Sequence, residues 1–562
     1  MRRGRRARIA IAGALLVAIA GGGIPARGAV PAGSPPTCPA APPLTEPSAW
    51  DGTVIYEVFV RSFADSDADG SGDLAGLLTR LDTLNDGDPG TTDDLGVGAL
   101  WLMPVFPSPS WHGYDVTDDR SVDPEVGSVE ELRALVAAAH ARGVRVILDL
   151  VINHTSSRHP DFLAALAGGP ERSRYLWAEE DPGWPPVAGG APWHAGAAGW
   201  YYGAFSPAMP DRNLRDPGVT ADLHAAARFW LEEVGVDGFR LDGVKHLVEN
   251  GPTEQLNQPE NAAWLRELRS AIHAVDPDAL VLGEVWDSRE TGMAYRAGGA
   301  LDAVTDFAFG DGLVPAIARG DGAALAADLA ALGTSGTPGW PATFLTNHDQ
   351  ERIASRLSGL AGPVALAAAV LLTAPGIPIV WQGEELGMPG QKPDERIRAP
   401  LPWDGTGPGF GFTAGVPWQP FEPGAETRNV AAQVADTGSL RARYAGLIRL
   451  RGAHPALGAD AATHALAADA RPVAAILRTQ GPERIVVLHN LSGKPVAAPA
   501  LTLAAGPLCG TPRARLLWAS DGSAPALTDP RVTAVGGVSA WQPVASIGPW
   551  GSLVIALDEA EG

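Results

Sequence analysis

The chain has 562 residues, of which 45% are hydrophobic and 19% are charged, so it can bury a large core and form more than one domain. Its formal net charge of −22 predicts repulsion from nucleic-acid phosphates and from anionic lipid. The composition therefore argues against a nucleic-acid partner, whereas a neutral polymer would not be repelled.

Residues 1–31 are predicted to be a signal peptide. Five arginines within the first eight residues precede an apolar run over Ile9–Ile24, and small residues follow near Ala26–Ala29. The alternative is an uncleaved membrane anchor, but the run is short and rich in Gly and Ala. We therefore expect a secreted protein with no stable membrane association after processing.

Residues 32–48 are rich in Pro, Ala and Ser, which predicts a linker. The only two cysteines are Cys38 and Cys509. In an exported chain two cysteines favour a disulfide, and two unpaired thiols are the alternative. The bridge would join the N-terminal arm to the C-terminal region.

Residues 49–456 alternate short apolar runs with amphipathic stretches such as Val129–Ala141. The runs predicted to be strands are VIYEVFV, ALWLMPV, VRVILDLV, VDGFRLD, ALVLGEV, AVTDFAF, ATFLTN and IPIVWQG. Eight β–α units in a row favour an α/β fold of the (β/α)₈ or TIM barrel type over an open doubly wound sheet. The first strand is not followed by a Gly-rich phosphate motif, which argues against a nucleotide-binding fold.

Two connections are too long for simple loops. Residues 155–216 follow the third strand, are rich in Trp, Pro and Gly, and are predicted to form an inserted, irregular subdomain. Glu384–Asn429 follow the eighth strand. Residues 457–562 change to short β-like runs separated by turns, which predicts a C-terminal antiparallel β-sandwich domain.

Ionisable residues lie at the ends of several predicted strands, or just beyond them. The five stretches that contain them are HGYD (His112–Asp115), DLVINH (Asp149–His154), GFRLDGVKH (Gly238–His246), GEVW (Gly283–Trp286) and FLTNHD (Phe344–Asp349). Because parallel barrel strands present their C-terminal ends on one face, these residues are predicted to line one pocket.

Two of these carboxyl groups suit the hydrolysis of a glycosidic bond. A retaining enzyme needs an acid and a nucleophilic carboxylate about 5–5.5 Å apart, and Asp242 and Glu284 follow the adjacent strands four and five. Arg240 is two residues before Asp242, so both side chains share a face, and a guanidinium favours an ionised carboxylate. Glu284 follows the apolar run ALVLG, and an apolar setting raises a carboxyl pKa. A single such residue is more often a helix cap or a surface ion pair, but the whole set favours catalysis.

The five motifs resemble those of the α-amylase superfamily of retaining glycoside hydrolases, from about Trp50 to the C-terminus. The resemblance implies that Asp242 is the nucleophile, Glu284 the acid/base, and Asp349 a third carboxylate that binds sugar hydroxyls and stabilises the transition state. The substrate-binding residues that it implies are Tyr114, Asp115, His154, Arg240, Lys245, His246 and His348.

The chain departs from the family pattern in places. MPDRN (Met209–Asn213) is similar to the family motif MPDLN, with Arg212 replacing leucine, and Gly243 stands where α-amylases usually have alanine. Lys245–His246 is the α-amylase form, whereas GQKPDERIRAPLPW (Gly390–Trp403) is similar to an oligoglucosidase segment. The resemblance is therefore to α-amylases intermediate with oligo-α-glucosidases.

Alternating carboxylates after the first strand predict a Ca²⁺ site. Its expected ligands are Asp65, Asp67, Asp69, Ser71 and Asp73. Position twelve is Gly76 instead of Glu, so the loop is not an EF-hand, and a solvated acidic turn is the alternative. The resemblance also implies a second Ca²⁺ that pins the subdomain to the barrel. Its ligands would be Asn153, Asp211 and the backbone carbonyl of His246.

The sequence predicts a monomeric enzyme that cleaves internal α-1,4-glucosidic bonds of starch- or glycogen-type glucans with retention. The alternative within the family is an exo-acting α-glucosidase or a maltooligosaccharide transglycosylase. A non-catalytic relative, such as a transporter heavy chain, would have lost carboxylates that are present here. Six tryptophans are predicted in loops on the active face, either as sugar-stacking platforms or as packing residues: Trp111, Trp184, Trp193, Trp200, Trp403 and Trp418.

Overall fold

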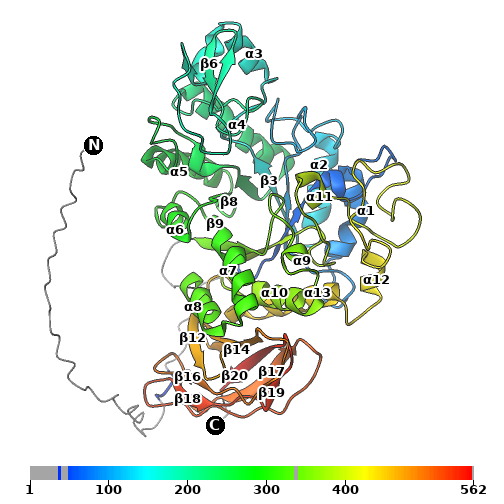
Figure 1. Ribbon diagram of the computed structural model, residues 1–562, viewed down its shortest axis with the longest axis vertical. Helices are drawn as coiled ribbons and strands as arrows, with labels where there is room; N and C mark the ends of the chain where they lie inside the picture. The colour runs from blue at the N-terminus through cyan, green and yellow to red at the C-terminus, as the bar shows by residue number, and fades with distance from the viewer. Residues whose placement is uncertain (1–35, 39–47, 334–338, 560–562) are drawn as a thin grey trace, which may run out of the picture.

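The computed structural model describes residues 36–38, 48–333 and 339–559. The predicted signal peptide and most of the predicted linker lie outside the described residues. The barrel occupies the middle of the molecule, with the inserted subdomain at one end and the C-terminal domain at the other (Figure 1). None of the helices in the described ranges has the length and apolar character needed to cross a bilayer.

The predicted TIM barrel is confirmed. Its eight strands close in the order β1-β11-β10-β9-β8-β7-β3-β2, and every neighbouring pair is parallel. The strands are β1 (Ile55–Val58), β2 (Ala99–Leu102), β3 (Arg145–Leu150), β7 (Gly238–Leu241), β8 (Leu280–Gly283), β9 (Ala303–Asp306), β10 (Trp340–Phe344) and β11 (Ile377–Trp381). They are short and almost entirely buried, which explains their continuous apolar runs.

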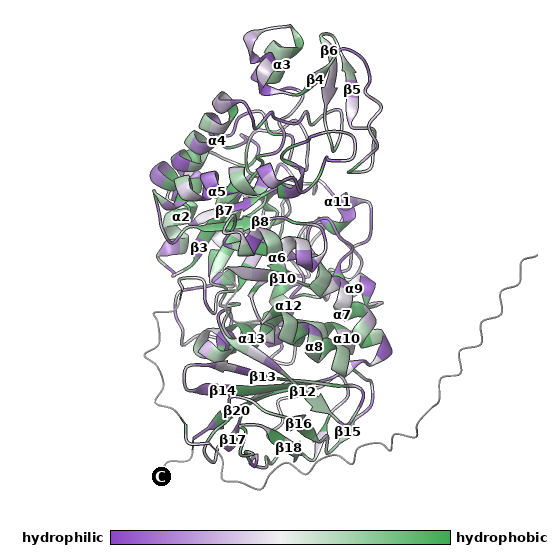
Figure 2. Ribbon diagram, turned by 90° about the vertical axis from the view of Figure 1, so that its left-hand side faces the viewer, coloured by the Kyte–Doolittle hydropathy of each residue, from purple (hydrophilic) through white to green (hydrophobic). Residues whose placement is uncertain are grey.

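Amphipathic helices cover the barrel. In α2 (Val129–His140) the Ser128 side chain caps the N-terminus by accepting from the Glu131 N–H, and Leu132 and Leu135 face the strands. Figure 2 shows the contrast, with largely hydrophobic strands β7 and β8 inside helices of mixed character. The other helices around the barrel are α1 (Leu74–Leu84), α4 (Pro217–Phe229), α5 (Pro259–His273), α6 (Arg289–Ala297), α7 (Phe307–Arg319), α8 (Gly322–Leu332), α10 (Ala361–Thr373) and α13 (Leu440–Ala453).

The sixth strand is shorter than its apolar run predicts. β9 ends at Asp306, whose side chain accepts from the Phe309 N–H and caps α7. The sequence Phe307–Phe309 therefore begins a helix, and the prediction that it continues the strand is wrong. An aspartate within an apolar run was the available signal for this N-cap.

The inserted subdomain is more regular than predicted. It contains α3 (Pro160–Leu166) and a three-stranded antiparallel sheet in the order β4-β6-β5. The strands are β4 (Trp177–Ala178), β5 (Trp193–Gly196) and β6 (Gly199–Tyr202). The predicted insertion after the third strand is present, and its strands of two to four residues are too short to produce a recognisable alternation in the sequence.

The C-terminal domain is antiparallel, as predicted, but its two sheets differ greatly in size. A seven-stranded sheet has the order β17-β20-β14-β13-β12-β16-β18, and β15 pairs only with β19. The strands are β12 (Ala462–Ala468), β13 (Val473–Gln480), β14 (Glu483–Asn490), β15 (Val496–Ala497), β16 (Leu501–Leu503), β17 (Arg513–Ala519), β18 (Val538–Trp541), β19 (Ser546–Ile547) and β20 (Ser552–Asp558). Cys38 and Cys509 form a disulfide, which confirms the predicted bridge.

Buried polar groups join the C-terminal domain to the barrel. Arg478 on β13 is fully buried and donates to the backbone oxygens of Thr373, at 3.1 Å, and Gly458, at 2.5 Å. The His489 Nε2 lies 3.3 Å from the Thr373 hydroxyl. Because a buried guanidinium without partners is costly, these contacts fix the domain against the end of α10.

Candidate active site

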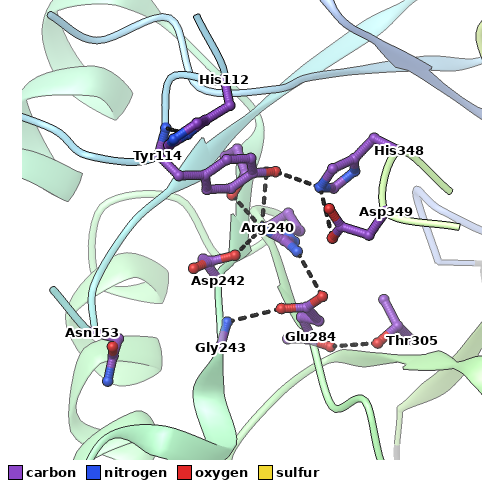
Figure 3. A network of polar contacts seen from close by, with 12 residues as sticks. His112, Tyr114, Asn153, Arg240, Asp242, Gly243, Glu284, Thr305, His348 and Asp349 are labelled. Carbon is purple, nitrogen blue, oxygen red and sulfur yellow. Dashed lines mark hydrogen bonds and ion pairs between the residues drawn. The ribbon is translucent and has the colours of Figure 1, made fainter. Parts of the chain in front are cut away.

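The three predicted catalytic carboxylates meet at the C-terminal end of the barrel. In the β7–β8 register Leu241 is opposite Gly283, so Asp242 and Glu284 leave neighbouring strands at the same level. Asp349 follows β10 and approaches from the other side (Figure 3). All three line one cleft with a volume of about 700 Å³.

A single guanidinium holds two of these carboxylates. Arg240 is 1% exposed, and its Nη1 lies 2.7 Å from Oδ1 of Asp242 and 2.7 Å from Oδ1 of Asp149. Its Nη2 lies 3.1 Å from Oε1 of Glu284. Although burial opposes the charge, Asp149 and Glu284 raise the pKa of Arg240 well above its ordinary value. The predicted shared face of Arg240 and Asp242 is therefore present as a direct contact.

Glu284 is placed to act as an acid. Burial raises its pKa to about 7, against the opposing charge of Arg240. Its Oε2 accepts from the Gly243 backbone N–H at 3.0 Å. Gly243 has a φ of +56°, a conformation that favours glycine, which explains why this position departs from the usual alanine.

Asp349 differs from Glu284 because two cations contact it. His348 Nε2 lies 3.1 Å from Oδ2 of Asp349, and Arg398 Nη2 donates to Oδ1 at 2.8 Å. Burial favours the neutral acid, but the charges of His348 and Arg398 lower the pKa of Asp349 below its ordinary value. The site therefore contains one carboxyl poised to carry a proton and another that stays ionised.

Two carboxylates, Asp349 and a residue on the first strand, favour the protonated form of His348. Its Nδ1 lies 2.5 Å from Oε1 of the fully buried Glu57. Burial alone would lower the His348 pKa, but Asp349 and Glu57 raise it to about 9. The Tyr114 hydroxyl lies 2.8 Å from His348 Nε2 and donates to Asp149 at 2.9 Å, and the two rings stack with their centroids 5.5 Å apart.

Most of the predicted substrate-binding residues line the cleft. They are Tyr114, His154, Lys245 and His246. Arg240 and His348 are buried behind this lining and act on it through Asp242, Glu284 and Asp349.

Asp115 is outside the cleft lining. It is 4% exposed, and its Oδ1 accepts from the hydroxyls of Ser108, at 2.6 Å, and Ser110. These two bonds hold the carboxylate in the wall of the preceding loop. Direct substrate binding by Asp115 is therefore not supported, and its place in the motif reflects support of the loop that carries Tyr114.

Several lining residues escaped sequence reasoning. Trp286 is 45% exposed, stacks on Phe307 with ring centroids 4.7 Å apart and lines the cleft. Subdomain residues Val187 and Ala188 form another part of the lining. Further lining residues that were not named as substrate-binding residues are Phe205, Ser206 and Met209. His112 belongs to the HGYD motif, and Lys392, Asp394 and Arg398 belong to Gly390–Trp403, the segment similar to an oligoglucosidase.

Of the six predicted loop tryptophans, only Trp111 lines the cleft. Trp418 supports it, with ring centroids 5.3 Å apart. Trp403 is buried and donates to the Phe63 carbonyl oxygen at 2.7 Å. Trp184 and Trp200 pack with the buried Trp193 in the subdomain. Packing therefore accounts for most of the set.

Part of the acidic loop suits a cation. Side-chain oxygens of Asp65, Asp67 and Asp73 lie within 4.8 Å of one another, a spacing compatible with oxygens around one Ca²⁺. Asp69 instead accepts from the Ser71 N–H at 2.7 Å, and the Ser71 hydroxyl accepts from Arg61 at 2.8 Å. The donor set that fits is thus smaller than the predicted five.

The second predicted calcium site has different chemistry. The Asn153 amide nitrogen donates to Asp211 Oδ2 at 3.3 Å and to the His246 carbonyl oxygen at 2.6 Å. Arg212 points elsewhere, with Nη2 2.6 Å from Asp119 and Nε 3.3 Å from the His154 carbonyl oxygen. The three predicted ligands meet, but they satisfy one another and do not present the oxygen set that Ca²⁺ requires.

The fold and the site together define a class, the barrel glycoside hydrolases that work with carboxyl groups on neighbouring strands. Residues 57–460 match the family model described as the alpha-amylase catalytic domain. The chain therefore belongs to the α-amylase family.

Several known proteins resemble the chain. It is 39% identical to Alpha-amylase 3 of Dictyoglomus thermophilum over 360 residues. This aligned region covers 63% of this chain and 68% of the relative. It is 31% identical over 519 residues to a probable alpha-glucosidase of Rhizobium meliloti, covering 80% and 91% of the two chains. The crystal structure of an alpha-amylase from H. orenii superimposes with a TM-score of 0.79 at 35% identity, covering 90% of this chain and 99% of the other.

Proposed function

We propose that the protein hydrolyses internal α-1,4-glucosidic bonds of starch- or glycogen-type glucans with retention of configuration. The observation that carries this proposal is the bridge by Arg240 between Asp242 and Glu284, which places two carboxyl groups in one cleft, of which Glu284 has a raised pKa. A neutral glucan is also compatible with a chain of net charge −22.

The chain's residues supply both halves of a double displacement. Asp242 attacks the anomeric carbon while Glu284 gives its proton to the departing glycosidic oxygen, which leaves a covalent glycosyl-enzyme. Glu284, now ionised, takes a proton from water as that water attacks, and Asp242 is released. Arg240 holds Asp242 in place through a direct ion pair, and the ion-paired Asp349 stabilises the positive charge that develops on the sugar ring.

The lining of the cleft favours internal cleavage. Lys245 Nζ lies 2.5 Å from the Trp286 carbonyl oxygen, so these two residues form one edge next to Glu284, the acid that protonates the leaving group. An exposed aromatic ring on that side can bind glucose units beyond the bond that is cut. Val187 and Ala188 of the inserted subdomain contribute another wall of this cleft.

One observation favours an exo-acting enzyme as the second candidate. Lys392, Asp394 and Arg398 line the cleft, and Arg398 contacts Asp349, so this segment is in position to close the site behind a non-reducing end. The similarity to a probable alpha-glucosidase is compatible with this reading.

The products from soluble starch discriminate between the two modes. Internal cleavage predicts a rapid fall in viscosity and iodine colour at low release of reducing ends, with mixed maltooligosaccharides. Glucose alone from the first minutes, with viscosity almost unchanged, would contradict it. Digestion of maltotriose in parallel, with all sugars identified, detects transglycosylation through products longer than the substrate.

Two further properties belong to this proposal. We infer export from the N-terminal sequence and from the Cys38–Cys509 disulfide, since such bonds persist in oxidising compartments. We also infer that Asp65, Asp67 and Asp73 hold one Ca²⁺, whose chemistry there would be structural. We expect the working enzyme to be a monomer.

A further inference from the structure

A hollow with a volume of about 410 Å³ lies between the barrel and the C-terminal domain. This volume is within the range of small-molecule sites, and no residue is shared with the active-site cleft. The barrel contributes α10, α13 and the loop after β11, and the C-terminal domain contributes the turns after β17 and before β20 (Figure 1). We call it the junction groove. The residues used below are Gly362, Arg428, Arg443, Asp521 and Trp550.

Trp550 is held in the groove by both domains. Its φ is +52°, an uncommon conformation for a bulky residue and one that costs free energy. The ring fits because a Cβ at Gly362 of α10 would lie 2.3 Å from its Cδ1, and one at Gly493 would lie 3.3 Å from its Nε1. Glycines on both sides of the junction thus make room for this ring, which remains partly exposed.

Polar groups line the same groove. Arg428 Nη1 donates to the Pro423 carbonyl oxygen at 2.9 Å, and its guanidinium carries five N–H donors in all. Asp521 accepts from the Ser523 N–H at 3.0 Å, and hydrogen bonds from Ser523, with a smaller contribution from the charge of Arg443, lower the Asp521 pKa. The groove therefore combines an aromatic ring with two guanidinium groups and one carboxylate.

Small residues form part of the lining of the groove, beside larger apolar residues such as Leu386 and Leu440. Alanines and glycines of α10 and neighbouring loops line it, namely Ala361, Gly362, Ala365, Gly387 and Gly438. These small residues leave space for a ligand instead of filling it with side chains. Because Arg478 and His489 fix the C-terminal domain on the barrel, the groove is formed before a ligand arrives.

We propose that the junction groove binds a segment of an α-glucan chain, at a second site that retains the polymer while the cleft cuts it. The C–H face of a sugar stacks on an aromatic ring, and its hydroxyl groups bind guanidinium donors and a carboxylate. The groove supplies an aromatic ring, two guanidinium groups and a carboxylate. This inference rests on the proposed function, which makes the substrate a neutral glucan. The alternative is that Arg428 and Arg443 bind an anionic ligand in the groove.

The test uses the full-length Asp242→Asn protein, so that bound glucan is not degraded. Trp550→Gly removes the ring and also suits the positive φ, so its fold should be retained. The matched control is Ala540→Gly, because Ala540 also has a positive φ, +50°, in the same domain and does not line the groove. Maltoheptaose binding is measured by calorimetry, and retention of the protein is measured in native gels containing starch.

We expect two maltoheptaose sites in the parent and in Ala540→Gly, and one in Trp550→Gly. Affinity for starch in the gel should fall about tenfold or more in Trp550→Gly, equivalent to the loss of one aromatic stacking contact. Arg443→Gln should weaken the second site without removing it. With the catalytic residues restored, kcat/KM for a short aryl maltooligoside should be the same in all variants.

Unchanged stoichiometry and retention in Trp550→Gly would overturn the inference. It is equally overturned if inorganic phosphate binds with a dependence on Arg443 and maltoheptaose does not, which would make the groove an anion site. Failure of the proposed function is distinguishable from both results. In that case the wild type leaves starch intact, whereas the calorimetric loss of a site in Trp550→Gly is still observed.

Discussion

The active-site cleft and the loop over Asp65–Asp73 both gather carboxylates, but they neutralise them differently. In the cleft, buried cations touch the carboxylates, as Arg240 does with Asp242 and Glu284. In the loop the partners are mostly backbone N–H groups, such as those of Ala68 and Gly70, which donate to Asp65. In the cleft, burial raises the pKa of Glu284 while neighbouring cations lower the pKa of Asp349, and carboxyls in different protonation states suit acid–base chemistry. Backbone donors leave a net negative charge, which suits a metal ion.

The largest effect is expected where a fixed cation faces the nucleophile. Asp242→Asn should lower kcat/KM for starch by about 10⁴-fold or more, because no glycosyl-enzyme can form on an amide. The contact with Arg240 can persist through the amide oxygen, so thermal melting should change little. Near wild-type activity in this variant would contradict the catalytic role of the cleft carboxylates, and with it their distinction from the carboxylates of the Asp65–Asp73 loop.

Glu284→Gln should cause the next largest loss of activity. We expect a loss of about 10²- to 10⁴-fold with starch, and a much smaller loss with an activated aryl glycoside, whose leaving group hardly needs a proton. Because the Glu284 pKa is raised to about 7, wild-type kcat/KM should fall as the pH rises above that value, as the acid loses its proton. With the aryl substrate, kcat/KM of Glu284→Gln should not show this fall at alkaline pH. If the fall persists in the variant, it is caused by the titration of a residue other than Glu284.

A smaller effect should follow from removing the charge behind His348. Glu57→Gln keeps a hydrogen-bond acceptor, and we expect kcat/KM to fall about tenfold because Asp349 loses part of its support. The folded pKa of His348, about 9, is above its ordinary 6.5. Its charge therefore stabilises the fold fully below about pH 6.5, and this contribution is lost as the pH rises through 9.

Melting temperatures recorded between pH 6 and 10 measure this linkage, and Glu57→Gln should flatten the decline. Glu384→Gln is the matched control. Glu384 is also buried, and its pKa is raised to about 8, but it contacts the Tyr444 hydroxyl instead of His348. Because its folded pKa is raised, Glu384 also loses a stabilising effect as the pH rises, so Glu384→Gln should flatten the decline only up to about pH 8. If Glu57→Gln gives no further flattening between about pH 8 and 10, Glu57 has only a structural role.

The smallest effect is expected in the loop. EDTA should lower the melting temperature of the wild type by a few degrees, because bound Ca²⁺ stabilises only the folded state. Asp67→Ala should remove most of that sensitivity, whereas Asp69→Ala should retain it, since only Asp67 belongs to the three-carboxylate group. Equal EDTA responses in the two variants, or no calcium by elemental analysis, would contradict the proposal.

The sequence predicted the barrel because each buried strand has a continuous apolar run and the motifs lie at the strand ends. It predicted the contact of Arg240 with Asp242 through strand alternation. It could not show that Trp286 faces the cleft or that Asp115 accepts hydrogen bonds from serines, because these orientations depend on packing between loops. Glu57 and Asp149 were visible as charges inside apolar runs, but their partners are distant in sequence. The junction groove has no local pattern at all, since two domains form it.

The disulfide between Cys38 and Cys509 gives the chain the topology of a ring. The two residues are 471 positions apart, so the whole barrel and the inserted subdomain lie within the covalent loop. A protease that cuts once in any surface loop of that region would open the ring without releasing a fragment. Since Cys509 follows the barrel in the sequence, the disulfide forms only after the barrel sequence has been synthesised. An extracellular enzyme would thereby gain resistance to single cuts, and would lose it on reduction.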